Sequence, residues 1–158
     1  MDRRYKLVHY GRKTGNSLCP VKRFGPENAK KVVSFLSGFP EYAATPLVGL
    51  PALARELGVA SIHIKDESKR FGLNAFKVLG GSYAIGNYIA KRLGTELEKL
   101  PYSAIVGKEV RRQLGDVTFV TATDGNHGRG VAWTANRLGQ KCVVYMPEGT
   151  APQRLKAI

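Results

Sequence analysis

The sequence is poor in the features that define several common classes of protein. It has two cysteines, Cys19 and Cys142, and no CxxC spacing. Neither a disulfide framework nor a cysteine-based zinc site is therefore expected, and a reducing, cytoplasmic location is predicted. No run of about 18 apolar residues occurs, so no transmembrane helix is expected. The first residues lead into no apolar segment of the kind that a secretory signal needs, so no such signal is predicted.

The motifs of several enzyme classes are also missing. The sequence has no HExxH, no GxSxG, no Walker loop and no GxGxxG. Its three histidines, His9, His63 and His127, are far apart, so no metal site is predicted. What remains is an ordinary composition of 43% hydrophobic and 23% charged residues over 158 positions. That is enough apolar material for one domain with a hydrophobic core.

Acidic residues are scarce: 12 of them face 25 lysines and arginines, for a formal charge of +13. Residues 1–31 carry much of the excess, with nine basic and two acidic residues. We predict an extended basic arm over residues 1–25. Such an arm can contact phosphates, but a solvated leader or an acidic partner surface explains the charge equally well. Because no nucleic-acid-binding signature accompanies it, no nucleic-acid partner is expected.

The second half of the chain alternates strand and helix patterns. Helices are expected at residues 26–37, 51–57 and 76–93, after the glycine-rich turn up to about 138, and after 150; strands are expected at 61–65, 117–121 and 142–145. This order predicts parallel strand pairing and an α/β layer architecture.

The last residues resemble the start of a helix without its end. Thr150 is a possible cap and Pro152 suits a first turn, yet the chain stops at Ile158 with no C-cap signal. We therefore expect the sequence to be a fragment that ends partway through an element.

Two segments contain candidates for chemistry. The first is residues 66–77, which runs into the long helix expected at 76–93. That helix contains Gly80, Gly81 and Gly86, which predicts close approach by another backbone or a ligand. Lys77 lies near the helix N-terminus, where the macrodipole favours the neutral amine that a Schiff-base lysine requires. An ordinary surface lysine is the better explanation of Lys77 when it is considered alone.

The second segment is residues 121–130, a glycine-rich turn between a strand and a helix. Unpaired backbone N–H groups at such a turn suit a carboxylate or a phosphate. Asp124 and Asn126 are also favoured helix caps, so the residues alone leave open whether the turn is a cap or a site.

Together the two segments resemble the fold-type II pyridoxal-phosphate enzymes, the relatives of tryptophan synthase β, cysteine synthase and serine/threonine dehydratase. Within that superfamily the sequence is most similar to the diaminopropionate ammonia-lyase family, from about Thr45 to Ile158. The matching motifs are Lys-Asp-Glu-Ser-Lys-Arg-Phe-Gly-Leu-Asn-Ala-Phe-Lys at 65–77, Thr-Asp-Gly-Asn-His-Gly-Arg-Gly-Val-Ala-Trp at 123–133 and Val-Tyr-Met-Pro at 144–147.

The resemblance implies a role for individual residues. Phe76 and Lys77 match the phenylalanine–lysine pair whose lysine binds pyridoxal 5'-phosphate covalently, and Asn126 matches the asparagine that contacts the cofactor's 3′-oxygen. The substrate carboxylate is expected on the turn formed by Thr123, Asp124, Gly125 and His127.

Asp124 distinguishes the subfamilies. Dehydratases usually have serine at this position, whereas the ammonia-lyases have an aspartate that acts as a second base beside Lys77. The resemblance thus implies α,β-elimination of 2,3-diaminopropionate, with Asp124 serving the D-isomer. The alternatives are a serine/threonine dehydratase, or a non-catalytic basic fragment that binds nucleic acid or a partner.

The implied fold has two α/β domains, each with a three-layer parallel sheet. Residues 26–78 would belong to the large cofactor-bearing domain, and residues 79–158 would form most of the smaller one, truncated at its C-terminus. Family members are homodimers more than twice this long, with their phosphate loop downstream. We therefore expect the fragment alone to be inactive.

Overall fold

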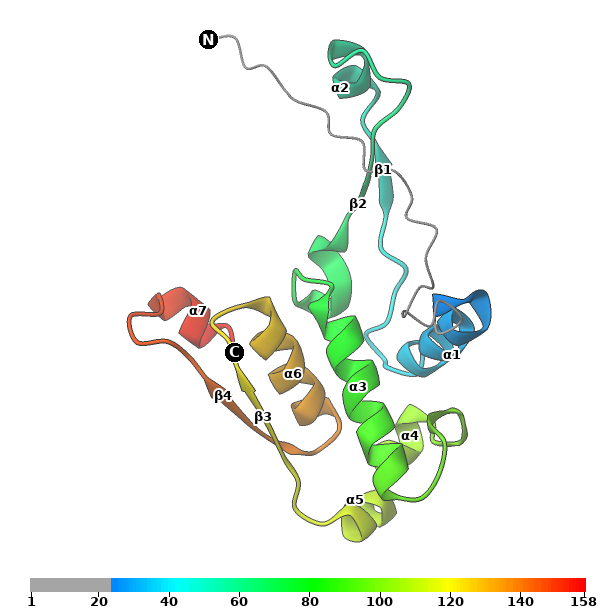
Figure 1. Cartoon of the computed structure of the whole chain (residues 1–158), viewed down its shortest axis with the longest axis vertical. Coiled ribbons are helices and arrows are strands. Elements are labelled where there is room, and N and C mark those ends of the chain that lie inside the picture. Colours follow the sequence, from blue (N-terminus) through cyan, green and yellow to red (C-terminus); the bar gives the residue numbers. More distant parts are fainter. Residues whose placement is uncertain (1–23) are drawn as a thin grey trace, which may run out of the picture.

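The computed structural model describes residues 24–158 (Figure 1). The greater part of the predicted basic arm and Cys19 lie outside these residues. The described helices are α1 (Pro26–Leu36), α2 (Pro51–Glu56), η2 (Glu67–Gly72), α3 (Lys77–Arg92), η3 (Leu97–Lys99), α4 (Tyr102–Ile105), α5 (Lys108–Leu114), α6 (Asn126–Arg137) and α7 (Pro152–Lys156). The strands are β1 (Leu47–Gly49), β2 (His63–Lys65), β3 (Thr118–Ala122) and β4 (Lys141–Tyr145). Across the described part of the chain, no helix is long and apolar enough to cross a membrane.

The strand pair β3–β4 is parallel, as the strand–helix–strand order predicts. Phe119 lies opposite Cys142 and Thr121 opposite Val144, and α6 makes the crossover between the strands. Residues that point toward α6 are half-buried, whereas Val120, Val143 and Tyr145 on the other face are exposed. The sheet is therefore covered on one face within residues 24–158.

The other strand pair corrects the expectation of parallel sheets throughout. β1 and β2 are antiparallel, with Val48 opposite Ile64. The connecting residues 50–62 place α2 beyond the end of the two strands rather than across their face (Figure 1). The chain therefore returns beside β1 as in a hairpin, without the crossover that parallel pairing requires.

The helices α3 and α6 lie side by side and run in the same direction (Figure 1). Near their N-terminal ends, a Cβ at Gly130 would come within 2.9 Å of the Val78 Cα. One turn further along, the buried hydroxyls of Ser82 and Thr134 are hydrogen-bonded at 2.8 Å. In both contacts the residue of α6 follows its partner on α3 by 52 positions in the sequence, so the start of α3 lies beside the first turns of α6.

The hydrophobic core contains side chains that precede residue 78 in the sequence and side chains that follow it. Phe39 is fully buried and packs on Phe71, Tyr102 and Trp133. Further along the same cluster, Ile89 of α3 is also fully buried. The loop that precedes Lys77 is thus packed on the same core as α3 and α6.

The glycines of α3 were expected to allow close approach by another backbone or a ligand, and at Gly86 the close neighbour is a side chain instead. At Gly86 a Cβ would lie 2.6 Å from Cζ of Phe35, so a side chain of α1, not a ligand, requires the glycine. Gly81 has ordinary contacts with α6, and Gly80 has nothing within 4 Å. At Gly80 the helix faces open space within residues 24–158, so the expectation of close approach stays a prediction at this position.

A pair of alanine substitutions tests the α3–α6 contact. Gly130→Ala is expected to lower the free energy of unfolding by about 1–3 kcal/mol, because the new methyl group meets α3 backbone that cannot move aside easily. Gly80→Ala is the matched control and should raise it by about 0.8–1.0 kcal/mol through helix propensity alone. Urea unfolding followed by circular dichroism measures both, and equal effects would contradict the close contact.

Candidate active site

Lys77 is the first residue of α3, at the end of the loop that follows β2. It is exposed, and its amine takes part in no hydrogen bond or ion pair with the other described residues. Phe76 precedes it at the N-cap position and is 59% exposed. The predicted lysine therefore has an unpartnered amine at a helix N-terminus, next to an aromatic ring that the core does not use.

The loop before Lys77 has an unusual backbone. Phe71 and Asn74 have φ angles of 50° and 53°, in the left-handed region that residues with side chains rarely adopt. Such conformations persist where the surrounding structure imposes them. The burial of Phe71 in the core and the contacts of its neighbour Arg70 supply that constraint.

Arg70 is buried, at 7% exposure, and connects this loop to the segment before β1. Its guanidinium donates to both carboxylate oxygens of Glu67, at 2.7 and 2.9 Å. It also donates to the carbonyl of Ala43 at 2.9 Å and to the hydroxyl of Thr45 at 3.0 Å. Lys65 donates to the Thr45 carbonyl. A bidentate pair with two further hydrogen bonds holds the loop in one geometry.

The same contacts predict a pH dependence of stability. The hydrogen bonds from Arg70 lower the pKa of Glu67 from 4.5 to about 2. The unfolded chain has the ordinary pKa, so the stabilisation is complete above about pH 4.5 and is lost as the pH falls toward 2. We expect a loss of roughly 3 kcal/mol from this group. Urea unfolding at several pH values should show a shallower acid decline for Glu67→Gln, and an unchanged decline would contradict this assignment.

The second predicted segment forms the turn between β3 and α6. The N-cap of α6 is Gly125, and no side chain caps the helix. Of the two alternatives that the residues left open, the structure does not show the cap, because the Asp124 carboxylate is paired with Arg154 of α7, at 2.6 Å. Thr123 shapes the turn by accepting a hydrogen bond from the Gly125 N–H at 3.2 Å.

A pocket of about 210 Å³ lies at this turn. Its lining contains three of the predicted residues, Asp124, Gly125 and Asn126, together with Arg129, Arg154, Ala157 and Ile158. His127 is exposed and does not line it. Because α6 has no side-chain cap, the N–H groups of its first turn are available at this end of the helix. Uncapped amides and the Arg129 guanidinium make this a place that suits an anion, whereas the charge of Arg154 is balanced by Asp124.

Arg129 joins the two predicted segments. It lines the pocket, and its Nη1 donates to the carbonyl of Leu73 in the loop before Lys77, at 2.8 Å. Its Nε is buried without a hydrogen-bond partner among the described residues. Lys77 itself does not line the pocket. The sequence alone did not predict Arg129 or Arg154 as site residues. The position of Arg129 within the Gly-Arg-Gly motif was a signal that could have identified it.

These residues fit two of the contacts expected for pyridoxal phosphate. Lys77 offers an unpartnered amine, and Asn126 lines a pocket at the uncapped start of α6. Close packing of α3 on α6 places the two helix ends next to each other. The phosphate-binding loop has no counterpart in these motifs.

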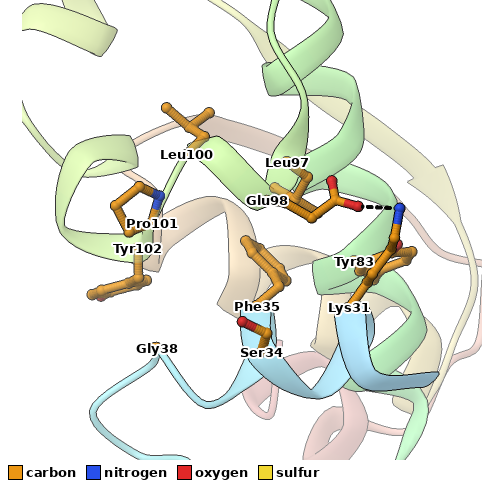
Figure 2. A pocket seen from close by; sticks show the side chains of 10 residues that line it. All are labelled: Lys31, Ser34, Phe35, Gly38, Tyr83, Leu97, Glu98, Leu100, Pro101 and Tyr102. Atoms are coloured by element: carbon orange, nitrogen blue, oxygen red, sulfur yellow. Dashed lines mark ion pairs between the residues drawn. The ribbon is translucent and has the colours of Figure 1, made fainter. Parts of the chain in front are cut away.

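A second pocket, of about 100 Å³, lies between α1, α3, η3 and α4 (Figure 2). None of the predicted site residues lines it. Lys31 and Glu98 form an ion pair of 2.6 Å at its edge, and this contact raises the pKa of Lys31 and lowers that of Glu98. Phe35, Leu97 and Leu100 make up much of the remaining wall. The pocket is therefore a gap beside the core, remote from the predicted chemistry.

Comparison with known proteins gives one consistent result. The diaminopropionate ammonia-lyase of Salmonella typhimurium is 54% identical over 128 residues, which are 81% of this chain and 32% of that protein. The Escherichia coli diaminopropionate ammonia-lyase in complex with D-serine has a TM-score of 0.79 at 45% identity, over 88% of this chain and 34% of that one. The holo form of the same enzyme has a TM-score of 0.80 at 44% identity, over 90% and 35%.

The chain thus spans about a third of the length of the relatives it matches. The structural likeness confirms the predicted fold class, with two strand pairs of an incomplete fold-type II architecture described. The family described as pyridoxal-phosphate dependent enzyme matches residues 39–158. This match covers most of the sequence and includes both predicted segments, so the chain belongs to the family of pyridoxal-phosphate dependent enzymes.

Proposed function

We propose that this chain is the N-terminal part of a lyase that converts 2,3-diaminopropionate and water to pyruvate and two ammonia by α,β-elimination. The main structural support is the hydrogen bond from Arg129 to the Leu73 carbonyl, at 2.8 Å. It ties the loop before Lys77 to the first turns of α6. The similarity to the Salmonella and Escherichia coli ammonia-lyases supports the substrate.

Three residues would handle the cofactor and the substrate proton. Lys77 would bind pyridoxal phosphate covalently, with the Phe76 ring beside it and Asn126 contacting the cofactor. When bound, this cofactor supplies an electron-accepting ring that stabilises the charge left on Cα. The released Lys77 amine would remove the Cα proton of the L-isomer, because its nitrogen has no other partner among the described residues.

Asp124 would remove the Cα proton of the D-isomer. Its carboxylate lines the pocket at the start of α6 and does not cap the helix, so stabilisation of α6 does not explain why an aspartate occupies this position. The substrate carboxylate would lie on the turn formed by Thr123, Gly125 and His127. The E. coli relative binds D-serine, an amino acid of the same configuration.

The wider organisation is proposed on the same basis. Residues 26–78 would belong to the large domain and residues 79–158 to the small one, in a cytoplasmic homodimer of the complete enzyme. The exposed Val120, Val143 and Tyr145 on the outer face of β3–β4 favour burial against further protein. Size-exclusion chromatography of the complete enzyme with light scattering tests the dimer.

A chimaera tests the activity. Residues 24–158 would replace the matching segment of the Salmonella relative, and pyruvate release from D- and L-diaminopropionate would be followed with added pyridoxal phosphate. We expect turnover of both isomers within about tenfold of the parent relative, a tolerance of roughly 1.4 kcal/mol in the barrier. A chimaera that folds and binds the cofactor but yields no pyruvate would overturn the proposal.

Two comparisons separate the alternatives. The chimaera should release pyruvate faster from diaminopropionate than from serine, and the reverse order would favour a serine/threonine dehydratase. Salt-dependent retention of the 158-residue chain on DNA, with no cofactor absorbance in the chimaera, would favour a basic binding fragment.

The 158-residue chain alone, with added pyridoxal phosphate, should release no pyruvate. Charge-assisted hydrogen bonds to phosphate stabilise binding by about 1.5–3 kcal/mol each, and several such contacts are expected downstream. Activity close to that of the chimaera would contradict this expectation.

A further inference from the structure

The ion pair between Asp124 and Arg154 connects two elements that are 30 residues apart in the chain. Asp124 lies in the turn before α6, and Arg154 lies on the five-residue helix α7. Arg154 Nη1 donates to Asp124 Oδ2 at 2.6 Å, and both residues line the same pocket. The pair is therefore part of the candidate site.

The pair contributes little to the stability of the fold. The side chains of Asp124 and Arg154 are 48% and 61% exposed, and ion pairs at such positions are screened by water. α7 has no buried residue that would depend on the contact. Replacement of Arg154 should consequently leave the protein folded.

The pair does affect the direction of the Asp124 carboxylate. A half-exposed aspartate without a partner changes rotamer readily. The donor from Arg154 engages Oδ2 and leaves Oδ1 without a partner among the described residues. The carboxylate is thus held in one orientation with one oxygen able to accept a proton. A general base must lie within hydrogen-bond reach of the proton that it removes.

We propose that Arg154 is a positioning residue for Asp124 and determines how well the enzyme uses D-diaminopropionate relative to the L-isomer. The inference rests on the proposed function, in which Asp124 serves the D-isomer and Lys77 the L-isomer. No hydrogen bond or ion pair within residues 24–158 connects Arg154 to Lys77, so the loss of Arg154 should affect one isomer only.

The test uses the chimaera described above with Arg154→Gln, which removes the charge but keeps a similar length. For the D-isomer, kcat should fall about tenfold or more with little change in KM, because misplacement of a base slows the chemical step. For the L-isomer, kcat should stay within about twofold. Arg154→Lys should restore part of the D-isomer rate.

Arg137→Gln is the matched control. Arg137 is also half-exposed and forms an ion pair of 2.6 Å, with Glu41, but it lies at the other end of α6. Arg137→Gln should leave kcat unchanged for both the D-isomer and the L-isomer. In the 158-residue chain, carbodiimide labelling of Asp124 measured by mass spectrometry should become several-fold faster with Arg154→Gln and should not change with Arg137→Gln.

The outcomes separate this inference from the proposed function. If the unsubstituted chimaera uses neither isomer, the proposed function fails, and the inference fails with it. If it uses both isomers and Arg154→Gln lowers both rates equally or neither, only the role of Arg154 is overturned. Unchanged labelling of Asp124 in Arg154→Gln would overturn the positioning contact itself.

Discussion

Lys77→Ala in the chimaera is expected to abolish elimination of diaminopropionate, with a loss of about a thousandfold or more in kcat for the L-isomer. The substitution removes both the amine that would bind the cofactor and the base for this isomer. Because Lys77 is exposed and its amine contacts no other described residue, the fold should not change. Pyruvate release and near-ultraviolet circular dichroism measure the two effects.

Borohydride reduction gives an independent readout of the same variant. With Lys77 present, reduction in the presence of pyridoxal phosphate should leave a cofactor adduct on the peptide that contains this residue. Lys91→Ala is the matched control, since Lys91 is an exposed lysine in the last turn of the same helix. The assignment would be contradicted if Lys91→Ala lacked the cofactor adduct at Lys77. It would also be contradicted if Lys77→Ala and Lys91→Ala were equally active.

Arg70→Met is expected to cause the largest loss of stability, about 3–5 kcal/mol. The methionine can occupy much of the buried space, but it removes both Arg70 donors from the carboxylate of Glu67, which keeps the Thr45 hydroxyl as a donor. The carbonyl of Ala43 also loses its donor from Arg70. A carboxylate that is only 20% exposed and has lost its cation is costly, and the left-handed backbone at Phe71 loses the contacts that stabilise it.

A double variant keeps this prediction testable even if Arg70→Met does not fold. Glu67→Leu combined with Arg70→Met removes both charges, so it should be more stable than Arg70→Met alone. Urea unfolding of the wild-type chain, both single variants and the double variant measures the coupling. Additive losses would show that the two side chains act independently, which would contradict the bidentate pair.

Local sequence patterns determined much of the fold. Long periodic segments predicted α3 and α6, and β-branched runs predicted β3 and β4 near their observed bounds. Their alternation predicted the parallel pairing of β3 with β4. These features depend on residues close together in the chain, and such residues alone specify periodicity and turn chemistry. The motifs around Lys77 and Asn126 likewise indicated the family that the comparisons show.

Only the tertiary structure decided the features that depend on distant residues. The antiparallel pairing of β1 with β2 depends on the course of the connection that contains α2, and the need for glycine at Gly86 depends on Phe35 of another helix. Asp124 is a favoured cap by residue type, but its carboxylate pairs with Arg154, 30 residues away. Arg129 reaches back 56 residues to Leu73. A residue's type limits which contacts it can make, whereas the packing of α3 on α6 and the position of α7 select which partner is within reach.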